Sequence, residues 1–233
     1  MARNNSIFTT KKILFITLFI ESLVVTIAIA GAVILDRSPT TYFSEIDRQG
    51  YVTYISCLQF AIAAILAWQI FRIAKTPRKL AKSRFFWLVS SIGLLFLALD
   101  DIFEIHEHID LWLHNLLAIE ETKLTDLADD FIVGGYLVFL TIFVAFQWRN
   151  LKIFQPSFIF FKLGFVLTLA MVMLDIFSNN NLFISMMTDD PTLELSIQQW
   201  VGAIEDSIKI FAEGMFIVGI YGCWQIANSL RKQ

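Results

Sequence analysis

Long apolar runs separated by short polar segments make up most of this chain. Six of the runs are long enough to cross roughly 30 Å of hydrocarbon as α-helices. They cover residues 12–35, 51–73, 84–110, 127–148, 157–177 and 198–227. The pattern predicts one all-α domain over residues 1–233, an integral membrane bundle of six transmembrane helices.

Composition supports this fold class by excluding others. Hydrophobic residues make up 57% of the chain, which includes 23 Phe, and the mean hydropathy is +0.65. These values are too apolar for a soluble domain of this length. A net charge of −3 at pH 7 gives no support to nucleic-acid binding. Membrane lipids are therefore the expected partners, while a homo-oligomer or a larger membrane complex stays open.

Lys and Arg gather in alternate connections between the runs. They lie before the first run, between the second and third, around the start of the fifth, and after the last. These residues are Arg3, Lys11, Lys12, Arg72, Lys75, Arg78, Lys79, Lys82, Arg84, Arg149, Lys152, Lys162, Arg231 and Lys232. Because short loops rich in Lys and Arg stay in the cytoplasm, the pattern predicts that both termini are cytoplasmic.

The first run has an alternative interpretation as a cleavable signal peptide. Lys11 and Lys12, the apolar residues that follow them, and the small residues Ala28 and Ala30 fit such a segment. Cleavage would leave five spans and an external N-terminus. An uncleaved first span is preferred, because the run is long and contains Glu21.

Acidic residues are concentrated near the end of the third run, in the string LALDDIFEIHEHIDLWLH. At about 100° per residue, one face of a helix collects four carboxylates and one imidazole. These side chains belong to Asp100, Asp101, Glu104, Glu107 and His108. On the same wheel His106 and Asp110 point elsewhere.

Other predicted helices present acids at the same depth. Asp126, Asp129 and Asp130 begin the fourth run, and Asp175 ends the fifth. The last run opens with an acidic face that also carries a lysine, formed by Glu205, Asp206, Lys209 and Glu213. Lys209 can neutralise one carboxylate, so the remainder require protons, water or a bound metal ion. Carboxylates in the first turn of a helix can also be solvated caps, which is the alternative for Asp126 and Asp129.

The convergence of these faces predicts a divalent metal site at the outer side of the membrane. Its expected ligands are Asp100, Asp101, Glu104, Glu107, His108, Asp130, Glu205 and Asp206, with His106, Asp126, Asp129, Asp175 and Lys209 as additional candidates. Carboxylates with an imidazole suit Mn²⁺, Fe²⁺ or Zn²⁺ slightly better than Mg²⁺ or Ca²⁺.

Glu21 and Glu213 are the deepest ionisable groups. Charged groups inside a span are costly and usually face the interior of a bundle. Two interpretations stay open for them. Each carboxyl is either protonated and bonded to a neighbouring helix, or it forms part of an ion path or relay.

Two strings carry a resemblance to a known group of proteins. LALDDIFEIHEHI and, in the last run, EDSIKIFAEGMFIVG resemble a loose family of uncharacterised prokaryotic multi-pass membrane proteins. The resemblance implies a shared site at Asp100, Asp101, His106, Glu107, Glu205 and Asp206, in an inner, plasma or thylakoid membrane. It implies no established activity.

A second likeness is to class I prenyl-processing enzymes. The string DDIFE from Asp100 resembles their aspartate-rich Mg²⁺ motif, and Glu205, Lys209 and Glu213 match the spacing of their second metal motif. Lys209 departs from that motif, because it stands where those enzymes have Ser or Thr.

Three classes of function follow from these patterns. The preferred one is transport or permeation of a divalent cation through the acidic pocket, since rings of Asp and Glu select cations. The alternatives are a metal-dependent membrane enzyme acting on a lipid or isoprenoid substrate, and an accessory or assembly subunit of a membrane complex.

Overall fold

The structure, a computed structural model, describes residues 2–43, 50–76, 78–103, 105, 108, 109, 112, 116, 128–179, 188 and 190–232. The regular elements in these ranges are α1 (Ala2–Ile34), α2 (Thr40–Phe43), α3 (Tyr51–Ile73), η1 (Ala81–Ser83), α4 (Arg84–Phe103), α6 (Ala128–Leu151), η2 (Lys152–Ser157), α7 (Phe158–Asn179) and α9 (Pro191–Arg231). All of them are helices. The predicted all-α fold is therefore confirmed for the described residues.

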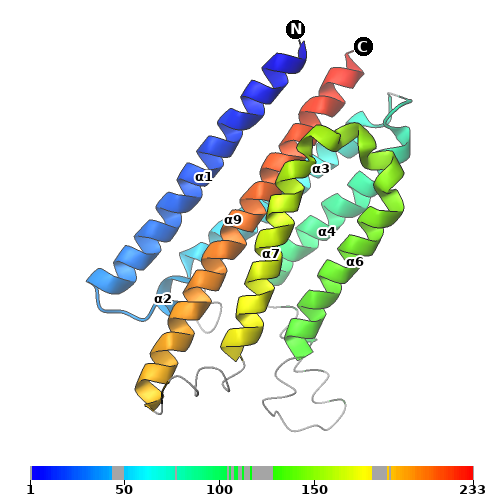
Figure 1. The fold of residues 1–233 in the computed structure, drawn as a ribbon. Coiled ribbons are helices and arrows are strands. Elements are labelled where there is room, and N and C mark those ends of the chain that lie inside the picture. The colour runs from blue at the N-terminus through cyan, green and yellow to red at the C-terminus, as the bar shows by residue number, and fades with distance from the viewer. Residues whose placement is uncertain are drawn as a thin grey trace.

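Several of these helices are long and apolar enough to cross a membrane. Within the described residues there are five such stretches, at Thr10–Ile34, Tyr51–Ile73, Ala81–Phe103, Gly134–Asp175 and Pro191–Arg231. The fourth stretch runs through α6, η2 and α7, and Figure 1 shows the chain reversing its direction between α6 and α7. These helices are compatible with a membrane protein.

The last helix begins earlier than its apolar run. Residues 191–197 lie outside the predicted span, yet α9 starts at Pro191 and is 41 residues long. The Asp190 side chain accepts a hydrogen bond from the Thr192 backbone N–H at 2.9 Å, and proline is well suited to the first helical position. Apolar periodicity does not detect such a polar start. At 1.5 Å per residue α9 is roughly 60 Å long, so it exceeds the length needed for one crossing.

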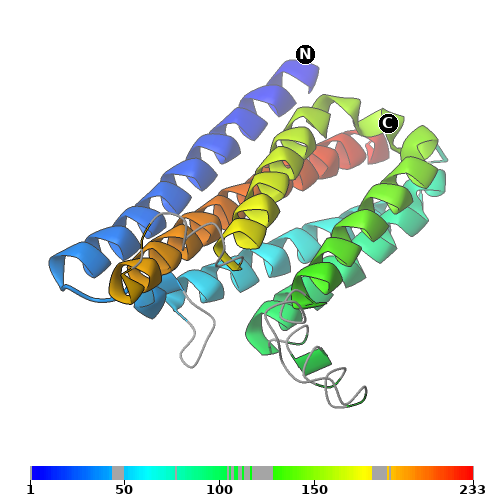
Figure 2. The same cartoon turned by 60° about the horizontal axis from the view of Figure 1, so that its bottom comes forward.

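α9 is the central element of the bundle. It packs against α1, α3 and α7, and α3 in turn packs against α4. α6 contacts α4 through aromatic side chains, with Phe86 stacked on Phe143 at 5.5 Å between ring centroids. Figure 2 shows α1 and α6 on opposite sides of the bundle. The N- and C-termini lie at the same end (Figure 1).

Two buried apolar clusters form at different heights along the bundle. The first, which we name the terminus-side layer, contains Ile70, Leu80, Trp87, Phe154, Ile220 and Cys223, among others. The second, the loop-side layer, is built around Ala28, Phe43, Val52, Ala203 and Ile210. Buried polar side chains lie between the two layers along both α3 and α9, among them Ser56, Gln59 and Glu213, and they belong to the candidate site.

Candidate functional site

A set of polar side chains lies in the interior of the bundle between the two apolar layers. We name it the polar layer and define it as Glu21 of α1, Ser56 and Gln59 of α3, Asp101 of α4, and Lys209 and Glu213 of α9. Only 1% of Glu21 and 4% of Glu213 is exposed. Charged groups at such depth in an apolar bundle are unfavourable unless they are paired, protonated or bound to an ion.

Ser56 joins two carboxyl groups from different helices. Its Oγ lies 2.6 Å from Asp101 Oδ2 and 2.7 Å from Glu213 Oε1. A hydroxyl has one hydrogen, so Ser56 donates to one of these carboxyls at a time. The other short contact is a hydrogen bond only when that carboxyl carries a proton and donates it to Ser56. The geometry therefore fits one added proton shared by the Asp101, Ser56 and Glu213 group.

Lys209 supplies the positive charge of the polar layer. Its Nζ donates to Asp101 Oδ1 at 3.0 Å, and the side chains of the pair are 20% and 10% exposed. Lys209 and Glu213 are four residues apart on α9, so their side chains lie on one face of the helix. The prediction that Lys209 neutralises one carboxylate is confirmed, with Asp101 as the partner.

Glu21 is held by α3 on one side and by α9 on the other. Gln59 Nε2 donates to Glu21 Oε1 at 2.7 Å. On the α9 side the Glu21 carboxyl lies where a Cβ at position 214 would stand, so a side chain there would overlap it. Gly214 thus lets the Glu21 carboxyl lie against α9, where the Cβ of any other residue would block it.

Three oxygen atoms of the polar layer receive no hydrogen bond from the described residues. They are Glu21 Oε2, Gln59 Oε1 and Glu213 Oε2, and all three are buried. Buried polar atoms in proteins normally have partners. Within the described part of the chain, these oxygens are therefore acceptors that a proton or a cation could satisfy.

The predicted metal ligands and additional candidates whose side chains are described on helices belong to α4, α7 and α9. Asp100 is buried like Asp101, and it interacts electrostatically with Tyr136 of α6. Glu205 and Asp206 are half-buried on α9, as is Asp175 on α7. Described residues include no group of three or more His, Cys, Asp or Glu side chains suited to hold a metal ion.

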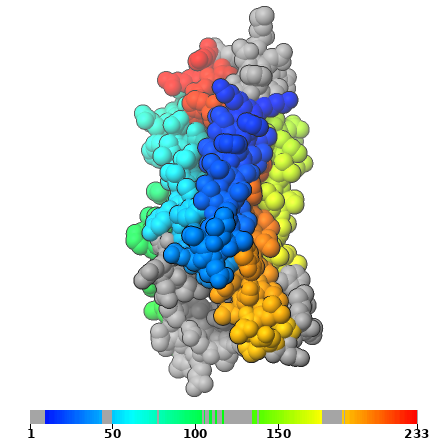
Figure 3. Space-filling view, turned by 90° about the vertical axis from the view of Figure 1, so that its left-hand side faces the viewer, coloured from blue at the N-terminus to red at the C-terminus, as the bar shows by residue number. Residues whose placement is uncertain are grey.

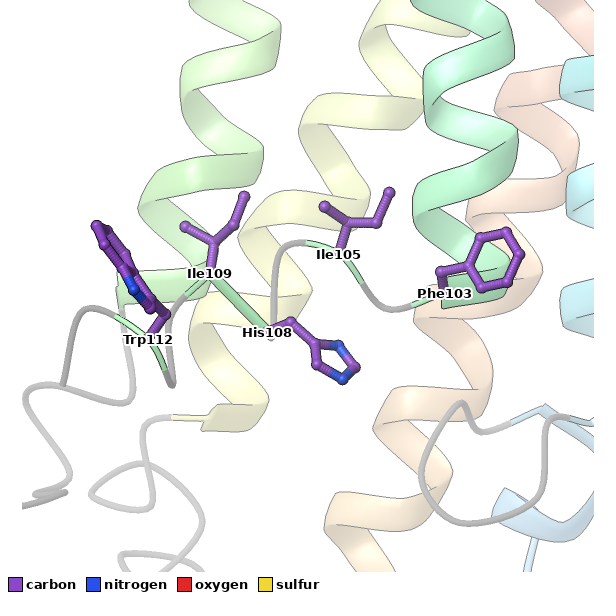
Figure 4. Close-up of a pocket in the computed structure, with 5 residues that line it drawn as sticks. All are labelled: Phe103, Ile105, His108, Ile109 and Trp112. Atoms are coloured by element: carbon purple, nitrogen blue, oxygen red, sulfur yellow. The ribbon is translucent and has the colours of Figure 1, made fainter. Parts of the chain in front are cut away.

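His108 is exposed and lies apart from the polar layer. It lines an apolar surface hollow with Phe103, Ile105, Ile109 and Trp112. In Figure 4 its imidazole points to the opposite side of the segment from Ile105 and Ile109. The described neighbours of His108 in this hollow are apolar, and its predicted partners Glu104 and Glu107 lie outside the described residues.

The remaining predicted site residues lie outside what the structure describes. For Glu104, His106, Glu107 and Asp126 this holds for the whole residue, and for Asp129 and Asp130 it holds for the side chain. The divalent metal site that depends on these residues stays a prediction.

Sequence reasoning missed Ser56, Gln59 and Gly214. The available signal was a pair of polar residues three positions apart inside the apolar run 51–73, which places them on one helix face. Uncharged polar residues are common in membrane helices, so this signal was weak without the partner helices.

Comparison with known proteins gives one family match. The family model described as "Domain of unknown function (DUF8692)" matches residues 13–221, which include every residue of the polar layer. No curated protein and no solved structure matches the chain.

Proposed function

We propose that this chain, which belongs to the family of this domain of unknown function, is an integral membrane protein. It carries cations across the membrane through the polar layer. Six transmembrane helices, α1, α3, α4, α6, α7 and α9, form the bundle. Both termini face the cytoplasm.

The surface of the bundle supports membrane insertion. Large apolar side chains are exposed along the outer face of α1, which Figure 3 shows beside α3 and α9. These side chains include Phe15, Phe19, Leu23, Ile27 and Ile34. An exposed apolar surface of this kind is unfavourable in water and favourable in lipid.

The charge distribution supports the orientation. Figure 1 shows the two termini, the α3 to α4 connection and the α6 to α7 connection at one end of the bundle. That end carries basic residues such as Arg78, Lys79, Lys152 and Arg231. Short basic connections are retained in the cytoplasm, which favours a cytoplasmic location for this end.

One observation carries the proposed function. The carboxyls of Glu21, Asp101 and Glu213 share the polar layer with a single lysine, Lys209, whose ammonium is 3.0 Å from Asp101. Carboxyls in excess over fixed positive charges favour cations over anions in a protein interior. Ser56, which contacts both Asp101 and Glu213, also gives protons a direct connection between two of these groups.

Flux measurements in proteoliposomes test this function. A potassium gradient with valinomycin imposes an inside-negative potential, and uptake of H⁺, Na⁺, Ca²⁺ or Mn²⁺ is followed with internal dyes. Uptake of at least one of these ions should exceed that of protein-free liposomes. The Ca²⁺ and Mn²⁺ measurements also test the divalent cation expected from the sequence.

Glu213→Gln is the decisive variant for this assay. The amide removes the ionisable group but can still donate to Ser56, so the fold is retained while flux should fall by at least about tenfold. Asp36→Asn is the matched control, because Asp36 is exposed and has a φ of 49°, which asparagine adopts readily. Flux equal to that of empty liposomes for all four ions, or unchanged flux in Glu213→Gln, would contradict the proposal.

A further inference from the structure

The three unpartnered oxygens of the polar layer define a smaller site within it. We propose that Glu21 Oε2, Gln59 Oε1 and Glu213 Oε2 bind one monovalent cation of the sodium class. This inference rests on the proposed cation-carrying function, and it names the ion and its ligands.

Contacts among the three helices bring these ligands together. Gln59 follows Ser56 by three residues on α3, so both side chains lie on one face. Ser56 contacts Glu213 at 2.7 Å, while Gln59 contacts Glu21 at 2.7 Å. Gly214, the residue after Glu213, touches the Glu21 carboxyl. α1, α3 and α9 thus bring these three side chains into one neighbourhood, and each helix contributes one of the unpartnered oxygens.

Counting charges in the polar layer leaves one negative charge to neutralise. Asp101 is paired with Lys209 at 3.0 Å. The two short contacts of Ser56 require one proton, and since Asp101 already accepts a hydrogen bond from the Lys209 ammonium, we assign this proton to Glu213. Glu21 remains as the single unbalanced carboxylate. One monovalent cation neutralises it, whereas a divalent ion would leave an excess positive charge.

The ligand atoms select the chemical class of the ion. All three are oxygens, and His and Cys are absent from the polar layer as defined, so hard cations are preferred over transition metals. Because position 214 is a glycine, the Glu21 carboxyl lies close against α9, and we expect the oxygens to form a small cage. A small oxygen cage favours Na⁺ over the larger K⁺.

Protons compete with sodium at this site. Glu21 bonds the neutral Gln59 of α3 and lies near Glu213 of α9, while Asp101 of α4 and Lys209 of α9 are the other charged groups of the polar layer. Acidification protonates Glu21 and removes the charge that holds the cation. Sodium affinity should therefore fall as the pH is lowered.

Direct binding of ²²Na⁺ to the purified full-length protein in detergent tests the inference. Wild-type protein should bind ²²Na⁺ saturably at pH 8, with weaker binding at pH 5.5, and unlabelled Na⁺ should displace the label better than K⁺. Gln59→Leu removes one ligand and should weaken binding by at least about tenfold. Ser91→Ala is the control, because Ser91 is buried and bonds the Ala64 carbonyl outside the polar layer.

The outcomes separate this inference from the proposed function. Folded wild-type protein without saturable ²²Na⁺ binding at pH 8 would overturn the sodium site, whether or not the Gln59→Leu variant folds. Proton flux in the same preparation would then leave cation carriage standing. Saturable binding that Gln59→Leu weakens, without flux of any ion, would support the site and overturn transport.

Discussion

The apolar layers above and below the polar layer are built differently. The terminus-side layer uses large side chains, including Trp87 and Phe154, whose rings meet edge to face at 5.3 Å. The loop-side layer is a smaller cluster, whose buried members are Ala28, Phe43, Val52, Ala203 and Ile210. The terminus-side layer therefore places more buried apolar side chains across the bundle than the loop-side layer does.

The polar layer is also more exposed on its loop side than on its terminus side. Lys209, on the loop side, has a side chain that is still 20% exposed. Glu21 and Glu213, on the terminus side of Lys209, are almost fully buried. In the proposed transport cycle, the terminus-side layer is therefore the larger barrier, and ions exchange first with the loop side.

Truncation of the terminus-side layer should have the largest effect. Phe154 is fully buried, and Phe154→Ala should lower the free energy of unfolding by about 3 to 5 kcal/mol through lost packing and the cavity left behind. Thermal unfolding in detergent measures the change. Phe146→Ala is the control, since Phe146 is 82% exposed. Equal destabilisation by the two variants would contradict the importance of this layer.

A methyl group at position 214 should disturb the polar layer itself. In Gly214→Ala the new Cβ overlaps the Glu21 carboxyl, and overpacking of this kind lowers stability by about 1 to 3 kcal/mol. Cation flux should fall as well, because Glu21 is displaced. Gly202→Ala on the same helix meets no atom within 4 Å, so it should be neutral or slightly stabilising. Thermal unfolding of both variants, and flux in liposomes, would decide the point.

Truncation of the loop-side layer should be milder. Val52 is buried there, and Val52→Ala removes about two methylene equivalents, or roughly 1.5 kcal/mol. The same unfolding assay compares it with Leu58→Ala, a control at an exposed position of α3. If Val52→Ala lowers the free energy of unfolding as much as Phe154→Ala does, the two apolar layers contribute equally to stability.

The smallest effect is expected at the start of α9, beyond both layers. Hydrogen bonds from the Thr192 hydroxyl and backbone N–H lower the pKa of Asp190 below its ordinary value of 3.8. The cap is therefore fully formed above that value and is lost as the pH falls through the lowered pKa. Hydrogen exchange at residues 192–194, corrected for intrinsic rates, should speed up below this range.

Two variants of Asp190 check that assignment. Asp190→Ala should give fast exchange at every pH, while Asp190→Asn keeps a capping oxygen without a titrating group. Exchange in Asp190→Asn that follows pH as the wild type does would assign the effect to another residue.

The helices could be predicted from the sequence because each apolar run is long enough to satisfy its own backbone hydrogen bonds as a helix. Their ends were less predictable. α9 starts at Pro191 since a capping side chain and a proline stabilise a polar first turn, which no apolar pattern reveals.

Part of the candidate site was predictable for a similar reason. Glu21, Lys209 and Glu213 stand out because a charge inside an apolar run needs a partner. In the structure Lys209 bonds Asp101, Glu213 bonds Ser56 and Glu21 bonds Gln59. Ser56, Gln59 and Gly214 did not stand out, because small and uncharged polar residues are common in membrane helices. Their importance depends on which helix they face.

The sequence by itself determined the membrane-compatible helices and the excess of carboxyls over lysines, since hydropathy and charge belong to each segment alone. Only the tertiary structure decided that Ser56 links Asp101 to Glu213 and that Glu21 rests on Gly214. These contacts join α1, α3, α4 and α9, and their existence depends on how the helices rotate and pack against one another, which is set by side-chain fit across the whole bundle.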